Sequence, residues 1–312
     1  LFGRNATGGA ISIITEDPPE DFGGYFKTEF GNYNARQNQL YLGLPIGDSL
    51  GATVSLFESY QDLYGRNEVY GELGPMRDEF AEGARVKVRW DPADSFAMTL
   101  IAAYGNQFSS NSLSQENTRP SPLLGAGVEP DELDRVWHNN DLGGNSTMNE
   151  LYGGIVEWHP GPVDLKFIYS ENYAIVDEAH YDLDSTEKAE AYFYSADQFN
   201  DQKTYEFQIL SNEDTWLSDD IEWVAGLYRL EGEGGFGSLY LTLNAAGVAS
   251  ALLGLPDFLA PILGPILNST REWRYSDYRV EFSLRSGYVV YYELAKCHRR
   301  CALSRRSARD YQ

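Results

Sequence analysis

The chain has 312 residues, with 24 Lys and Arg against 47 Asp and Glu, and a formal net charge of -23. This acidic balance excludes a nucleic-acid binder, because the phosphate backbone would repel the protein. Aromatic residues make up 14 % of the chain, which contains 22 Tyr and 30 Gly but only 2 Cys. The composition is typical of a β-rich protein and excludes a disulfide framework.

Period-two alternation of apolar and polar residues predicts strands along most of the chain. In segment 84–90, apolar residues alternate with Arg85, Lys87 and Arg89, so the two sets lie on opposite faces of a strand. The mean hydropathy of -0.42 does not exclude a membrane barrel, whose interior is polar. Roughly ten strands are expected, within 25–33, 36–46, 50–56, 84–90, 96–102, 152–158, 163–170, 205–209, 221–227 and 275–284.

The links between these segments alternate in length. Short turns are predicted at 47–49, 91–94 and 159–162, where Gly, Pro and Asp gather. Long links are predicted at 62–79, 109–147, 177–202 and 232–269. Outer-membrane barrels combine short periplasmic turns with long extracellular loops, so the pattern favours a barrel with two unlike ends. Aromatic residues near the short turns are expected to form an interfacial girdle, namely Trp90, Phe96, Trp158 and Trp223.

The opening residues 1–15, LFGRNATGGAISIIT, are followed by Asp17 and Pro18. This segment resembles the end of the plug domain in TonB-dependent outer-membrane receptors. The resemblance implies an all-β fold, an antiparallel transmembrane β-barrel with roughly ten of that family's 22 strands, preceded by the last strands of a plug. It divides the chain into the end of the plug (1–18), the N-terminal part of the barrel with long extracellular loops (19–284) and an atypical basic tail (285–312). It also implies a multi-pass location in the Gram-negative outer membrane.

The expected tail differs from the rest of the chain in charge and in residue pattern. From Arg285 onward there are seven Lys or Arg and two acidic residues, without the alternation of a strand, so a frameshift or mispredicted end is the favoured explanation. Segment 297–301, with two Cys and one His, offers an incomplete tetrahedral set for zinc. No metal and no cofactor are therefore predicted.

By the same resemblance, the intact parent takes up a bulky, scarce nutrient, with a ferric siderophore favoured over cobalamin or a carbohydrate. Its partners are outer-membrane lipid, the nutrient and the TonB energy-coupling complex. The segment that binds this complex is not recognised here, so the chain is expected to be a fragment that does not transport by itself. One alternative is a soluble β-sheet carbohydrate-binding module or enzyme, which predicts that Val86 and Val88 are covered by a second sheet. Another is a passive porin, which predicts no plug.

Two groups of residues are candidates for function. Charges on a lipid face cost about 2–4 kcal/mol at the bilayer midplane, so the three cations of 84–90 are expected to face the lumen. There they would pair with acidic groups of the barrel or plug; the predicted plug-docking residues are Arg4, Arg85, Lys87, Arg89 and Glu206. The acidic loop 177–202 is interleaved with aromatic residues, and Tyr181, Tyr192, Phe193 and Tyr194 are predicted to contact ligand. No catalytic motif occurs in a suitable context, so the chain is not expected to be an enzyme.

Overall fold

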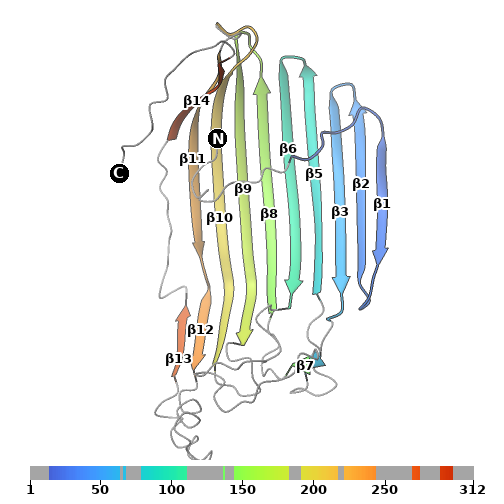
Figure 1. Ribbon diagram of the computed structural model, residues 1–312, viewed down its shortest axis with the longest axis vertical. Helices are drawn as coiled ribbons and strands as arrows, with labels where there is room; N and C mark the ends of the chain where they lie inside the picture. Colours follow the sequence, from blue (N-terminus) through green and yellow to red (C-terminus); the bar gives the residue numbers. More distant parts are fainter. Residues whose placement is uncertain are drawn as a thin grey trace, which may run out of the picture.

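The computed structural model describes residues 14–63, 66–67, 79–110, 136–137, 144–182, 191–216, 221–243, 269–274 and 289–297. Every regular element in these ranges is a strand, and Figure 1 shows most of them side by side in one broad sheet. No helix among the described residues has the length and apolar character needed to cross a membrane.

The main sheet is antiparallel and follows chain order. Its path runs β1-β2-β3-β5-β6-β8-β9-β10-β11-β14, while β12 pairs with β10 and with β13. The short β4 and β7 form a separate parallel pair between two long links. The strands are β1 (Gly23–Phe30), β2 (Arg36–Gly47), β3 (Leu50–Gln61), β4 (Arg66–Asn67), β5 (Glu79–Ala93), β6 (Phe96–Ser109), β7 (Val136–Trp137), β8 (Gly144–Trp158), β9 (Val163–Asp182), β10 (Ala191–Ser211), β11 (Ile221–Gly235), β12 (Ser238–Leu243), β13 (Ser269–Arg274) and β14 (Val289–Cys297).

One face of the sheet is apolar and exposed. Its clearest row consists of direct partners on seven successive strands, Leu50, Trp90, Met98, Val156, Phe167, Phe207 and Leu227. Val86 on the same face is 39 % exposed, and no second sheet covers it within the described ranges. The covering sheet required by the soluble alternative is therefore absent from this part of the chain. A band of outward apolar side chains is what a bilayer covers in a transmembrane barrel.

The opposite face is polar, as expected for a lumen wall. Thr53 and Lys87 are direct partners on it, and each is only 6 % exposed. A sheet with one apolar and one polar face fixes the register, because a slip of one residue would exchange the two faces. The alternation predicted for 84–90 thus places its three cations on the inner face.

The short turns predicted at 47–49, 91–94 and 159–162 all lie at one end of the strands, the upper edge of Figure 1, here named the short-turn end. At this end the rings of Trp90 and Phe96 are 5.9 Å apart, and Phe96 is the direct partner of Trp158. Both tryptophans are almost half exposed on the apolar face, which is where an interfacial girdle would lie. Trp223, near the start of β11, is partly exposed on the same face.

Two expectations about the long links are wrong. Segment 177–202 is largely a hairpin, because β9 continues to Asp182 and β10 begins at Ala191. Segment 232–269 likewise begins with strand, since β12 continues the pairing of β11 with β10. Beyond the apolar band neither face of a strand needs to be hydrophobic. The ends of β9 and β10 therefore resemble an acidic loop in sequence, although the two strands remain paired.

The end of the described chain also differs from expectation. The strand predicted at 275–284 lies outside the described residues. Strand β14 falls within 285–312, for which no strand is expected, and pairs with β11 from Tyr228↔Val289 to Ile221↔Cys297. The expectation that this segment lacks a strand is therefore wrong. Backbone pairing with the edge of β11 needs no apolar alternation, which explains why composition does not indicate it.

Candidate functional site

The candidate site lies where residues Ile14–Glu20, here named the inner-face segment, cross the polar wall. Pro18 and Pro19 lie directly over glycines of β3 and β2. A Cβ on Gly51 would be 2.6 Å from Pro18 Cβ, and a Cβ on Gly43 would collide with Pro19 Cγ. The two glycines thus leave the space that the rigid Pro-Pro pair occupies.

Lys87 of β5 holds this segment against the wall. Its Nζ lies 2.5 Å from Asp17 Oδ1 and donates hydrogen bonds to the carbonyl oxygens of Thr15 at 3.0 Å and Glu16 at 3.2 Å. The Lys87 side chain is 8 % exposed, whereas that of Asp17 is 57 % exposed. All three ammonium protons therefore have an acceptor, which is the condition for burying a lysine charge.

Arg89 extends this contact into a network across the wall. Its Nη1 lies 4.0 Å from Asp17 Oδ2 and 3.5 Å from Glu157 Oε2, and its Nε lies 3.7 Å from Asp91 Oδ2. Glu157 in turn lies 3.0 Å from Lys166 Nζ on β9. Negative and positive side chains thus alternate along the wall, from Asp17 of the inner-face segment to Arg89 on β5, Glu157 on β8 and Lys166 on β9. Such a network fixes the position of the segment more firmly than one exposed pair would.

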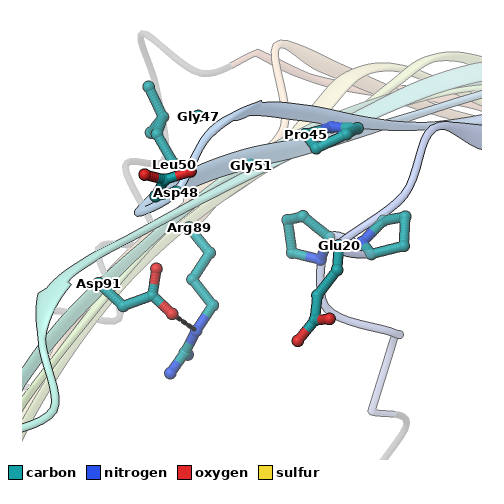
Figure 2. A pocket seen from close by; sticks show the side chains of 10 residues that line it. Glu20, Pro45, Gly47, Asp48, Leu50, Gly51, Arg89 and Asp91 are labelled. Carbon is teal, nitrogen blue, oxygen red and sulfur yellow. Dashed lines mark ion pairs between the residues drawn. The ribbon is translucent and has the colours of Figure 1, made fainter.

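A cavity of about 380 Å³ opens between the inner-face segment and the turn that joins β2 to β3. Figure 2 shows Arg89, paired with Asp91, on one side of this hollow and Glu20 on the other. Its lining also includes the two prolines of the segment and Pro45. The cavity is at the short-turn end of the sheet, so it faces the periplasmic side in a barrel of this orientation.

The structure brings only some of the predicted docking residues together. Lys87 and Arg89 contact the inner-face segment, while Arg4 lies outside the described residues. The Arg85 Nε is buried without a hydrogen-bond partner in the described part of the chain. Glu206 is in the same register row as Arg89 but four strand spacings away, roughly 19 Å along the sheet. It accepts a hydrogen bond of 2.7 Å from Gln208 instead.

Sequence reasoning missed the acidic partners. In the sequence, Asp17 belongs to the plug motif and Glu157 is one polar residue of a strand. The available signal is the alternation itself, which places Glu157 and Lys166 on the face that also carries Arg89. Which carboxylate reaches which cation depends on strand neighbours, and these are defined only once the sheet is assembled.

The predicted ligand-contacting aromatics do not form one surface. The rings of Tyr181 and Phe193 are 5.8 Å apart, whereas Tyr194 lies 4.4 Å from His180 and 5.6 Å from Tyr240. These are successive register rows, so they point to opposite faces of the sheet. The side chain of Tyr192 lies outside the described residues.

Tyr181 and Phe193, here named the aromatic row, face the interior, whereas His180, Tyr194 and Tyr240 face outward. Thr147 and Ser146 are neighbours on β8 but pair with Val176 and Glu178 of β9, so the extra residue Asp177 reverses the two sides of β9 beyond it. Burial raises the pKa of the Tyr194 phenol above its usual value, and the carboxylates of Glu178 and Asp197 raise it further. The phenol therefore stays protonated and can donate a hydrogen bond.

Similarity to known proteins is found in the fold. No protein-family model and no curated protein matches the chain. Among solved structures, the ferric yersiniabactin uptake receptor FyuA from Yersinia pestis has a TM-score of 0.57 and 13 % identity, over 93 % of this chain and 45 % of that one. The fold is that of the barrel wall of a TonB-dependent outer-membrane receptor.

Two further receptor-barrel structures are similar. The ferric-catecholate import receptor Fiu from E. coli K12, in its open form, has a TM-score of 0.53 and 11 % identity over 73 % of this chain and 36 % of that one. The FpvAI–pyocin S2 complex has a TM-score of 0.56 and 10 % identity over 73 % and 29 %. The chain therefore spans less than half the length of each of these proteins. Their fold belongs to the outer membrane, in agreement with the exposed apolar face of the sheet.

Proposed function

We propose that the chain is part of a receptor for energy-coupled uptake of a bulky, scarce nutrient, with a ferric siderophore as the cargo. The observation that carries this proposal is the inner-face segment, held on the lumen wall by Lys87 and Arg89. A passive porin keeps a water-filled channel, whereas a wall with a docked segment fits a barrel whose lumen holds a plug. The contacts of Asp17 thus favour the receptor over the porin.

The cargo class is supported by the solved receptors. FyuA is a ferric yersiniabactin uptake receptor, and Fiu is a ferric-catecholate import receptor. The aromatic row offers a matching surface at the end of the strands away from the short turns. Tyr181 and Phe193 present aromatic rings, and Tyr181 also a hydroxyl group, on the lumen side, which suits a ligand that carries aromatic rings and oxygen atoms.

Uptake would require the inner-face segment to leave the wall. Its anchors are ion pairs and hydrogen bonds rather than a large apolar surface, so a pulling force breaks them one after another. The partner that would supply this force is the TonB energy-coupling complex, which acts on plugs in receptors that this chain resembles. In this proposal Lys87 and Arg89 hold the closed state.

Ligand binding tests the cargo. The full chain, reconstituted in lipid, is titrated with ferric yersiniabactin and with a ferric tris-catecholate, with cobalamin and maltoheptaose as comparisons. Tryptophan fluorescence is expected to report binding of a ferric complex but not of the comparisons. Tyr181→Ala should weaken this binding about tenfold, which corresponds to about 1.4 kcal/mol.

The matched control is Tyr194→Ala, which removes the same side chain from the opposite face of the sheet and should leave the affinity unchanged. Tighter binding of cobalamin or maltoheptaose would replace the proposed cargo. Equal effects of the two substitutions would remove the aromatic row from the ligand site.

Transport is a separate test. Within the described residues, β1 pairs only with β2 and β14 only with β11, so further strands are needed to close a lumen. We therefore expect receptor-deficient cells that produce only this chain to show no uptake of radioactive ferric siderophore. Uptake that a protonophore abolishes would contradict this expectation.

A further inference from the structure

Two basic side chains stand out on the apolar face of the sheet. Among the outward positions of β5, β6, β8, β9, β10 and β11 that the structure describes, only Lys203 and Arg229 are Lys or Arg. They lie on adjacent strands, since Lys203 is the direct partner of Glu231 and Arg229 is the direct partner of Tyr205. They therefore form one cluster rather than two isolated charges.

The neighbours of this cluster are polar and aromatic. Lys203 Nζ lies 2.9 Å from Glu171 Oε1, and Arg229 forms an ion pair with Glu231. The Tyr169 hydroxyl donates a hydrogen bond of 2.6 Å to Glu171 Oε2, and its ring lies 5.2 Å from that of Tyr205. The Arg229 Nε is buried without a hydrogen-bond partner in the described ranges.

The cluster sits directly at the edge of the apolar band. Phe167, Phe207 and Leu227 lie on the same face, two residues nearer the short turns than Tyr169, Tyr205 and Arg229 and four nearer than Lys203; they are 42 %, 36 % and 44 % exposed. Moving away from the short turns, the outer surface thus changes from apolar side chains to tyrosines and then to charges. This order matches a bilayer, in which acyl chains give way to headgroups.

We propose that Lys203 and Arg229 bind the phosphate-bearing headgroup of a membrane lipid, with its acyl chain lying on Phe207 and Leu227. An ammonium group has three donors and a guanidinium has five, so one carboxylate partner leaves donors available to each. A phosphate oxygen accepts such charge-assisted hydrogen bonds, and basic side chains near a membrane surface attract anionic headgroups. This inference rests on the membrane-spanning fold and not on the proposed uptake function.

A lipid, rather than a free anion, is the occupant favoured by the apolar row. Free phosphate would gain only the polar contacts, in a cluster where Glu171 and Glu231 already offset the two cations and Asp201 adds a negative charge beside Lys203. A lipid adds the burial of Phe207 and Leu227, at about 25 cal/mol per Å² of apolar surface. The tyrosines lie between these two parts, at the level where aromatic side chains prefer the interface.

Native mass spectrometry tests the proposal on the full chain in detergent. The chain is titrated with phosphatidylglycerol, and retained lipid is counted. Lys203→Gln combined with Arg229→Gln should weaken retention at least about fivefold. Arg36→Gln is the matched control, since it removes a cation that pairs with Glu58 at 3.2 Å on the distant β2.

Two further measurements separate the outcomes. Lys203→Arg with Arg229→Lys keeps both charges and should retain lipid, which distinguishes loss of the site from loss of folding. Excess inorganic phosphate should displace little lipid, whereas full displacement would show a simple anion site. Unchanged retention in the Gln variant, or an equal loss in Arg36→Gln, would overturn the proposal. Ferric-ligand binding is measured in the same variants and is expected to be unaffected.

Discussion

At the scale of single residues, the burial of Lys87 decides how the inner-face segment is held. A lysine that is 8 % exposed needs acceptors for its charge, and here it has Asp17 and two backbone carbonyls. By contrast, Lys27 and Glu29 are both about half exposed although their charged atoms are 3.0 Å apart. Loss of one partner should therefore lower the free energy of unfolding more at the buried Lys87–Asp17 pair than at the exposed Lys27–Glu29 pair.

Replacement of Lys87 tests this difference. Lys87→Met removes the shared donor and is expected to lower the free energy of unfolding by about 1–3 kcal/mol, because acceptors at the wall lose their partner. Denaturant unfolding of the membrane-inserted chain, followed by tryptophan fluorescence, measures the change. Lys27→Met should cost less than about 1 kcal/mol.

A double-mutant cycle with Asp17→Asn isolates the pair itself. The double variant should be more stable than the sum of the two single effects predicts, because the second substitution has no pair left to break. Additive effects would mean that Asp17 contributes nothing beyond the backbone carbonyls.

At the scale of elements, β2 and β3 form a platform for the Pro-Pro pair. Gly43 and Gly51 are needed because the two prolines lie so close that a Cβ would collide with them. Backbone conformation does not require glycine at either position, since neither has a positive φ. A Cβ added to Gly47, in the same strand as Gly43, would meet no atom within 4 Å. Position on the sheet, rather than residue type, therefore decides which glycine matters.

Gly51→Ala tests the platform. The added methyl group would lie 2.6 Å from Pro18 Cβ, so the inner-face segment must shift away from β3. Hydrogen exchange of the backbone amides of Glu16, Asp17 and Glu20 is expected to increase, while the amides of β3 stay protected. Gly47→Ala is the control and should leave the exchange of the segment unchanged; a similar increase there would contradict the account.

At the scale of the whole molecule, the apolar face determines whether the sheet is stable in water or in lipid. Outward residues such as Leu100, which is 48 % exposed, lie between rows of other apolar side chains. Such a surface would aggregate in water, whereas it is stable in lipid. The polar inner wall and the apolar outer wall thus orient the sheet without any helix among the described elements.

Leu100→Arg tests the lipid face. A charge within the apolar band is expected to make folding into lipid less favourable by up to about 2–4 kcal/mol, the cost at the bilayer midplane. Ile168→Arg places the same side chain on the inner face, beside Glu206, and should cost much less. Folding into lipid vesicles, measured by the heat-modified shift in gel mobility, compares the two; equal losses would contradict the assignment of the faces.

The sequence by itself determined most of the strand positions and the two faces of the sheet. Period-two alternation is a local property, so segment 84–90 already separated Lys87 from Val86. The opening motif also indicated the receptor fold, because its residues are contiguous in the chain. Alternation failed at 177–202, where the hairpin of β9 and β10 extends beyond the apolar band and no face has to be hydrophobic.

Only the tertiary structure decided which charges and rings meet. Glu157 reaches Arg89, and Glu206 does not, because the number of strands between two residues sets their distance and no local pattern records it. The same holds for Tyr194, which joins His180 and Tyr240 while its sequence neighbour Phe193 points the other way. Local chemistry selects the face of a strand, and long-range pairing selects the partner.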